Sequence, residues 1–350
     1  MITFSLVAFN VLLSGALSFF VASLLTDLAL RAFRPRPGKV RLLLHALPFA
    51  KLVFDVVRGI PAQSFLWLRA LGVSQDIGVF QIGIGTSWFV PHVQFALGAR
   101  SADHTYSQSA SDLLAGLLVK RVSPWAPLII VVALASVSTA RLVRRFMAWR
   151  SASQAKQAIV GSALLVGRRH VGRQVVPIFV SPAVAGSPFL GGVAAPYVGF
   201  PAELWGTMSA AERRAALGHE LAHARERHLA FVTLLGMLSD VFWFLPRVGH
   251  CQRSFREACE LAADAHAVRE GTSPPVLASA LLRAREVSQG AQPSPVATLA
   301  ATGSSLSSRI DHLLDATRAP RFGFQYPVHA LVLTGWLALV VFRLVIFGNH

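Results

Sequence analysis

The chain has 350 residues, of which 53% are apolar and only 14% are charged, and its net charge is +16. Because an ordinary soluble protein carries about 25% charged residues, this composition excludes a typical soluble enzyme and favours an integral membrane protein with one polar domain. The basic residues cluster beside apolar runs, and no recognised nucleic-acid-binding motif is present. We therefore expect an anionic lipid bilayer, and no nucleic acid, as a partner.

The N-terminal part predicts two transmembrane helices within residues 1–58. The loop between them, residues 31–41, holds five basic residues, which indicates a cytoplasmic loop and places the N-terminus outside. Residues 59–123 are then expected to form an external region of loops or hairpins, to which no chemistry is assigned. Whether this region senses an activating signal is left open.

A third transmembrane helix is predicted over residues 124–140, and four arginines follow it between 141 and 150. Residues 141–325 are therefore expected in the cytoplasm, and a last transmembrane helix is expected over 326–350. The predicted fold class is a multi-pass α-helical protein of the inner (cytoplasmic) membrane with an α+β domain on the cytoplasmic side. The two cysteines, Cys251 and Cys259, lack metal-type spacing and fit structural thiols in a reducing compartment.

The cytoplasmic domain is predicted to begin with short strands and turns in residues 157–206, including the strand-like stretches 175–182 and 195–201. A helix follows, and its start is marked by Ser209 and Glu212, which form an S-x-x-E capping box just before Ala210.

This helix carries the sequence His219-Glu220-Leu221-Ala222-His223, an HExxH motif. Because residues four apart share one helical face, both imidazoles can bind the same metal ion, and Zn²⁺ is the ion that such a pair usually holds. Glu220 is then placed to act as a general base toward water. The alternative is a solvated helix that happens to carry two histidines.

A catalytic zinc site of this kind needs a third protein ligand. His228 does not fit the HExxHxxGxxH pattern, because residue 226 is not glycine, and we expect it to be a surface histidine. The helical stretch 256–268 offers Glu260 and Asp264, four residues apart on one face. Glu260 can bind zinc, and Asp264 can accept the free ring N–H of a ligand histidine and fix its tautomer.

The segments HELAHARERH, FWFLP and ELAAD, in this order, resemble the BlaR/MecR-type membrane zinc metallopeptidases, and more distantly the HtpX-type and CAAX-prenyl-protease-type enzymes. The resemblance covers about residues 175–315 and includes SLSSRIDHLL at 305–314, similar to the family's Leu-x-x-Arg-Ile segment. It implies a zincin-like (gluzincin) fold, with His219, His223 and Glu260 as zinc ligands, Glu220 as base and Asp264 beside a ligand histidine.

Two features depart from that family. Its members carry an external penicillin-sensor domain after the last span, which we do not expect here, and Ala263 stands where they have cysteine. The apolar stretch 229–245 is a test of the site, because a full membrane crossing there would separate Glu260 from the two histidines. We expect a core or re-entrant helix instead, and an intramembrane protease is the alternative.

The predicted reaction is hydrolysis of peptide bonds in a cytoplasmic or membrane-associated protein, with Glu220 moving the proton. Arg309 or His266 is expected to stabilise the oxyanion, with Arg309 preferred, and residues 195–201 are expected to pair with substrate as an added strand. The alternative is a non-proteolytic receptor with a structural zinc. The sequence leaves the substrate, the signal and the oligomeric state open.

Overall fold

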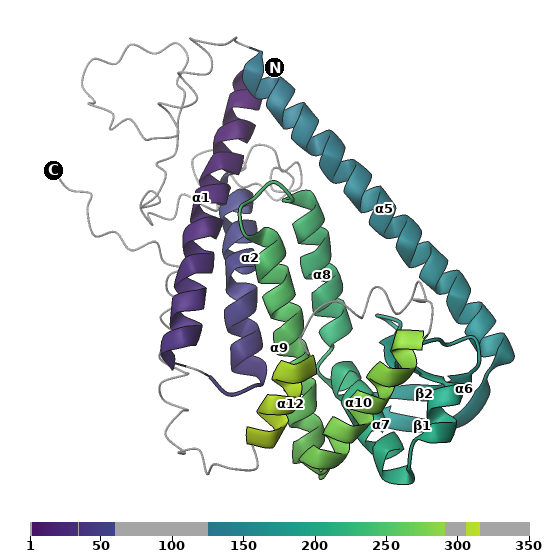
Figure 1. Ribbon diagram of the computed structural model, residues 1–350. Coiled ribbons are helices and arrows are strands. Elements are labelled where there is room, and N and C mark those ends of the chain that lie inside the picture. Colours follow the sequence, from purple (N-terminus) through teal and green to yellow (C-terminus); the bar gives the residue numbers. More distant parts are fainter. Residues whose placement is uncertain (1, 34, 60–124, 291–305, 316–350) are drawn as a thin grey trace, which may run out of the picture.

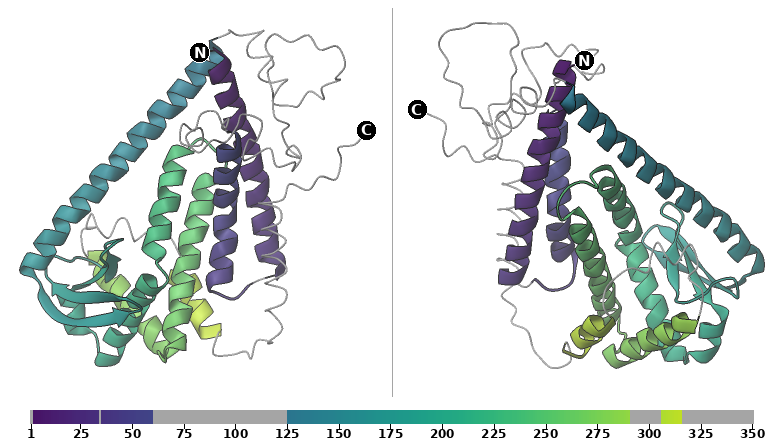
Figure 2. Two further views of the ribbon diagram at one scale, coloured as in Figure 1. Left: turned by 180° about the vertical axis from the view of Figure 1, so that it is seen from behind. Right: turned by 45° about the horizontal axis from the view of Figure 1, so that its top comes forward.

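The computed structural model describes residues 2–33, 35–59, 125–290 and 306–315, which form helices and one small sheet (Figure 1). The predicted region 59–123, except for its first residue, and the predicted last span 326–350 lie outside these residues. Two helices come first, α1 (Ile2–Phe33) and α2 (Lys39–Gly59), and a long helix follows, α5 (Ala126–Ser162). Helices α1, α2, α8 (His228–Val241) and α9 (Val248–Arg269) stand side by side, while α5 runs along one flank of the molecule (Figure 2).

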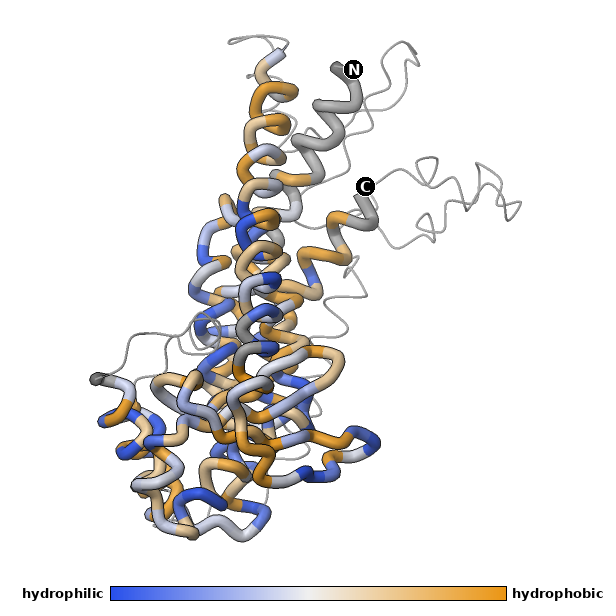
Figure 3. The backbone as a smooth tube through the Cα atoms, turned by 90° about the vertical axis from the view of Figure 1, so that its right-hand side faces the viewer, coloured by the Kyte–Doolittle hydropathy of each residue, from blue (hydrophilic) through white to orange (hydrophobic). Residues whose placement is uncertain are grey.

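The predicted multi-pass transmembrane architecture is wrong for this part of the chain. None of its helices is both long enough and apolar enough to cross a membrane. The apolar runs of α2 and α5 are not separate segments, because each belongs to a helix that also carries several charged residues. In α5 the apolar residues occupy the N-terminal half, and the same continuous helix then carries four arginines between 141 and 150 (Figure 3).

Helix α5 also crosses the predicted boundary between a span at 124–140 and a domain beginning at 141, and it continues to Ser162. The stretch 157–162, expected among strands and turns, is therefore helical. The domain division itself stays a prediction.

A four-stranded sheet follows α5, with the order β1 (Leu164–Val171), β2 (Gln174–Ser181), β4 (Tyr197–Pro201) and β3 (Phe189–Gly191). The predicted strands at 175–182 and 195–201 are confirmed as β2 and β4, with small changes at their ends. Strand β4 runs parallel to β2 and antiparallel to β3, and all five of its residues are buried. The sheet leaves β1 and β3 as its two edges.

Helices α6 (Ala202–Thr207), α7 (Ala210–Arg225), α10 (Pro274–Gly290) and α12 (Leu306–Asp315) complete the fold beside the sheet. Phe200 at the end of β4 and Leu204 in α6 are fully buried, and they share a core with Leu277 of α10 and Leu313 of α12. This core joins α7 to α10 and fixes one wall of the site.

The apolar stretch 229–245 does not lead the chain away from the site. Arg227 and Arg247 adopt left-handed backbone conformations at the starts of α8 and α9, with φ of 54° and 68°. The two helices pack against each other and run in opposite directions (Figures 1 and 2). Glu260 on the returning helix therefore lies at the same end as the HExxH motif, as the predicted site requires.

Ion pairs connect the opposite end of α8 to α5. Asp240 pairs with Arg145 and lies 3.4 Å from Nε of Arg141. Gly236 makes room for this arrangement, because a Cβ atom at that position would lie 2.7 Å from Nη1 of Arg145.

Candidate metal centre

The two histidines of the HExxH motif lie on one face of α7, with their Nε2 atoms 3.1 Å apart. The helix begins at Ala210, and the predicted capping box is confirmed, since Ser209 and Glu212 each accept from the other's backbone N–H. The cap sets the register of the helix, and the four-residue spacing then brings His219 and His223 together. Their ring planes are nearly perpendicular, at 77°, with centroids 4.8 Å apart.

Glu260 of α9 faces both rings. Its Oε2 lies 3.5 Å from Nε2 of His219, and its Oε1 lies 3.6 Å from Nε2 of His223. One nitrogen from each histidine and one oxygen from Glu260 all lie within 4.8 Å of one another. The structure thus brings together the three residues that the sequence predicts as ligands, although 37 positions separate His223 from Glu260.

Asp264, one turn after Glu260, lies behind His219. Its side chain is almost fully buried, with 1% of the residue exposed, and its Oδ1 is 2.9 Å from Nδ1 of His219. Asp264 thus lies beside a ring nitrogen of His219, the place from which the sequence predicts it to fix the tautomer of a ligand histidine; that role stays a prediction.

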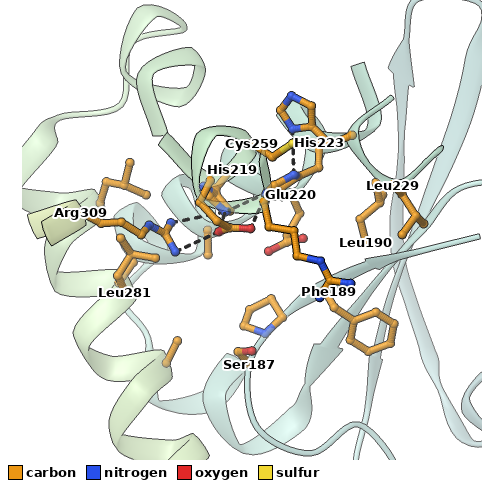
Figure 4. A pocket seen from close by; sticks show the side chains of 18 of the residues that line it. Ser187, Phe189, Leu190, His219, Glu220, His223, Leu229, Cys259, Leu281 and Arg309 are labelled. Atoms are coloured by element: carbon orange, nitrogen blue, oxygen red, sulfur yellow. Dashed lines mark hydrogen bonds and ion pairs between the residues drawn. The ribbon is translucent and has the colours of Figure 1, made fainter. Parts of the chain in front are cut away.

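Glu220 points into the same cavity from α7 (Figure 4). Burial raises the pKa of its carboxyl group to about 7, and the negative charge of Glu260 acts in the same direction. His219, Arg309 and the backbone N–H of Leu190 in strand β3 oppose this rise in pKa. A carboxyl group with a pKa near neutrality can both accept and release a proton at physiological pH.

The two imidazoles differ in their affinity for protons. Burial lowers the pKa of His223 to about 3, so this ring is neutral and keeps a lone pair. Burial also disfavours the charged form of His219, but the contacts with Asp264 and Glu260 outweigh it and raise the pKa to about 10. A metal ion entering the site must therefore displace a proton from His219.

These residues fit a divalent cation. When His219 has given up its proton and Glu220 is ionised, three carboxylates, those of Glu220, Glu260 and Asp264, lie around two neutral rings, and Arg309 is the guanidinium that contacts Glu260 and Asp264. Imidazole nitrogens and a carboxylate oxygen are the ligands that Zn²⁺ takes in catalytic sites.

The model of the BlaR1 peptidase M56 family matches residues 98–313, more than half of the chain, including every residue of this centre. The chain belongs to the peptidase M56 family. The resemblance seen in the sequence is thereby confirmed, and the protein is assigned to a family of metal-dependent peptidases that are generally membrane-associated. A search among curated proteins returned no match.

Arg309 of α12 is held by the acidic residues of this M56 centre. Its Nε and Nη2 donate to the two oxygens of Asp264, at 2.8 and 2.7 Å, and its Nη1 lies 3.0 Å from Oε2 of Glu260. Every guanidinium nitrogen thus contacts a carboxylate. The predicted oxyanion role of Arg309 stays untested, and the geometry favours positioning. His266, the other candidate, lies 3.7 Å from Glu270 and does not line the cavity.

The centre opens into a cavity of about 310 Å³ between α7, α9, α10 and strand β3. Apolar side chains of α10, including Leu277 and Leu281, form one wall, and Phe189 and Leu190 of β3 form another. Arg256 and Arg285 also line this cavity.

Strand β4, predicted at 195–201 to receive the substrate as an added strand, cannot do so. It lies between β2 and β3, so both of its edges already pair within the sheet. The edge beside the cavity is β3, which the sequence analysis did not single out as a strand. Strand β3 has only three residues, too few for an alternating pattern of apolar and polar side chains to be recognised in the sequence. Its pairing with β4 in the sheet identifies it as a strand.

His228 is a second correction. The sequence predicted a surface histidine, but only 2% of this residue is exposed, and it lines the cavity. The signal that could have revealed its burial is the apolar run that begins at the next residue.

Proposed function

We propose that this M56 peptidase is a zinc-dependent endopeptidase whose ion is held by His219, His223 and Glu260. The observation that carries the proposal is the meeting of two ring nitrogens and one carboxylate oxygen within 4.8 Å, next to a second carboxylate, Glu220. A structural zinc site usually closes with four cysteine or histidine ligands, whereas three ligands and an adjacent base are typical of catalytic sites.

When bound, Zn²⁺ would supply Lewis acidity, polarising a substrate carbonyl and favouring loss of a proton from water. Glu220 accepts that proton on its carboxylate as water adds to the peptide carbonyl carbon. It then delivers the proton to the amide nitrogen as the C–N bond breaks, so one water is consumed for each bond cleaved. The raised pKa of Glu220 suits both transfers.

Asp264 and Arg309 act through the ligands rather than on substrate. Asp264 holds Nδ1 of His219, and Arg309 holds Asp264 and Glu260 together. Because α12 supplies Arg309 from a distant part of the sequence, this contact couples the centre to the C-terminal part of the domain. The role we propose for Arg309 is therefore positioning.

The substrate is proposed to bind as an extended strand along β3. Leu190 directs its backbone N–H toward Glu220 rather than into the sheet, so the outer edge of β3 faces the centre. A peptide pairing with this edge would place a backbone carbonyl near Glu220 and would be recognised largely through main-chain hydrogen bonds.

The kind of substrate, the role in the cell and the association with lipid are also proposals. A protein that is cytoplasmic or membrane-associated is the proposed substrate, and regulated proteolysis in signalling is the proposed role. Association with anionic lipid is proposed from the net charge of +16. Flotation with vesicles that contain or lack anionic lipid tests the proposed lipid association. Equal binding to both kinds of vesicle would contradict it.

The deciding experiment compares the wild type with Glu220→Gln. The amide keeps the shape of the side chain but cannot accept the proton, so we expect peptide cleavage to fall by about 10²- to 10⁴-fold while the zinc content stays the same. Protein termini that appear with the wild type and are missing with the variant would identify substrates. Glu203→Gln, at an exposed position on α6, is the matched control and should cleave like the wild type.

Two results would contradict the proposal. Unchanged cleavage in Glu220→Gln would remove Glu220 as the base. Zinc retention in the wild type without any cleavage of the proteome would favour the receptor with a structural zinc.

A further inference from the structure

His228 is the first residue of α8, and its ring is turned back toward α7. The left-handed conformation of Arg227, with φ of 54°, ends α7 and starts α8 at a sharp angle. As a result, Nδ1 of His228 lies 3.0 Å from Nδ1 of His223, with the ring planes at 76°. This contact lies on the side of His223 that faces away from His219 and Glu260.

The direction of this hydrogen bond follows from the other side of the His223 ring. Its Nε2 atom faces Nε2 of His219 at 3.1 Å and Oε1 of Glu260 at 3.6 Å, where a lone pair is needed to bind a metal ion. A neutral imidazole carries one hydrogen, so that hydrogen must be on Nδ1. Nδ1 of His223 therefore donates, and Nδ1 of His228 accepts.

We propose that His228 is a positioning residue that fixes the tautomer and orientation of His223, so that the Nε2 lone pair of His223 faces the metal. The inference rests on the proposed zinc site and extends it. His228 would do for His223 what Asp264 does for His219, at a similar distance of 3.0 against 2.9 Å. The difference is that a neutral ring replaces a carboxylate, so only one of the two ligand histidines is paired with a negative charge.

His228 is not itself a ligand in this arrangement. Its Nδ1 is engaged with His223, and its Nε2 has no hydrogen-bond partner among the residues that the structure describes. The metal-ligand grouping in the described residues consists of His219, His223 and Glu260.

The test compares two nearly isosteric variants of the full chain, His228→Asn and His228→Leu. Asparagine keeps an acceptor oxygen close to the position of Nδ1, whereas leucine fills similar space without one. Loss of a partner behind a ligand histidine lowers metal affinity by about 10- to 100-fold, so we expect this loss for leucine and a change of only a few-fold for asparagine. Zn²⁺ affinity is measured by competition with a chromophoric chelator, and His266→Leu, on α9 outside the cavity, is the control.

A second measurement needs no variant at this position. In the metal-free wild type, ¹⁵N shifts of the His223 ring, assigned with His223→Gln, should show the hydrogen on Nδ1. A hydrogen on Nε2, or equal zinc affinity of the asparagine and leucine variants, would overturn the inference. If instead wild type and His219→Ala bind Zn²⁺ equally weakly while His223 keeps its Nδ1 hydrogen, the proposed metal site fails and the contact with His228 stands.

Discussion

Two clusters of buried charge lie at opposite ends of α8, and they differ in how far their charges cancel. At the end of α8, Asp240 pairs with Arg141 and Arg145 of α5, so one carboxylate faces two guanidinium groups. The protein supplies enough positive charge there to neutralise the buried acid. We call this group the α5–α8 clamp.

The metal centre, at the start of α8, has the opposite imbalance. Three carboxylates surround the histidine pair, and Arg309 is the one guanidinium that contacts two of them. A buried ion pair alone says little about function. What distinguishes the centre from the clamp is that, once His219 gives up its proton, its carboxylates outnumber the guanidinium that contacts them, and a divalent cation would neutralise the difference.

The largest expected difference between the two clusters follows removal of the metal. A chelator should abolish cleavage, and added Zn²⁺ should restore it. At free zinc 100-fold above the dissociation constant, the ion should add about 2.7 kcal/mol to the free energy of unfolding, measured by denaturant titration with and without zinc. Asp240→Asn, which changes only the clamp, should gain the same amount from zinc. Full cleavage in excess chelator would contradict the assignment.

After the loss of activity on metal removal, the largest effect on stability is expected for Arg309→Met. It leaves Asp264, of which 1% is exposed, without its guanidinium partner, and breaking a buried pair costs about 3–5 kcal/mol. Unfolding in urea measures the loss. Arg225→Met removes an exposed pair with Glu270 and should cost no more than about 1 kcal/mol. If both variants lose the same stability, Arg309 does not organise the centre.

Asp240→Asn should cost less, about 1.5–3 kcal/mol, because Arg141 and Arg145 are partly exposed and can be hydrated when the charge is lost. With zinc at saturation, its kcat and KM should remain those of the wild type. The same urea unfolding experiment measures the stability, and Glu270→Gln serves as the exposed control. A large fall in kcat would show that the clamp belongs to the catalytic machinery.

The smallest effect is a pH dependence at the centre. As the proposed base, Glu220 would act in its carboxylate form, and burial raises its pKa to about 7. A bound cation favours the ionised form of Glu220 over the protonated form. The apparent pKa of the acid limb of kcat/KM should therefore lie between the ordinary carboxyl pKa of 4.5 and about 7. Below it, activity should fall about tenfold for each unit of pH, as Glu220 becomes protonated. The pH profile checks this, and activity that rises on acidification would exclude Glu220 as the base.

Local signals in the sequence determined the start of α7, the pairing of His219 with His223, and the shared face of Glu260 and Asp264. Each depends on capping or on the helical repeat, which act over a few residues, so the amino-acid order is enough. The composition, by contrast, predicted a multi-pass membrane fold, whereas no helix in the described part of the chain is both long and apolar enough to cross a membrane.

Tertiary packing alone decided how these pieces meet. The contact of Arg309 with Asp264 spans 45 residues, the choice of β3 as the edge beside the cavity depends on strand order, and the burial of His228 depends on a single turn at Arg227. Such contacts form because helices and strands bury apolar faces against partners distant in the chain, and no periodicity within one element records which partner that is. The sequence therefore named the residues that we propose as metal ligands, and the fold determined which side chains lie against them.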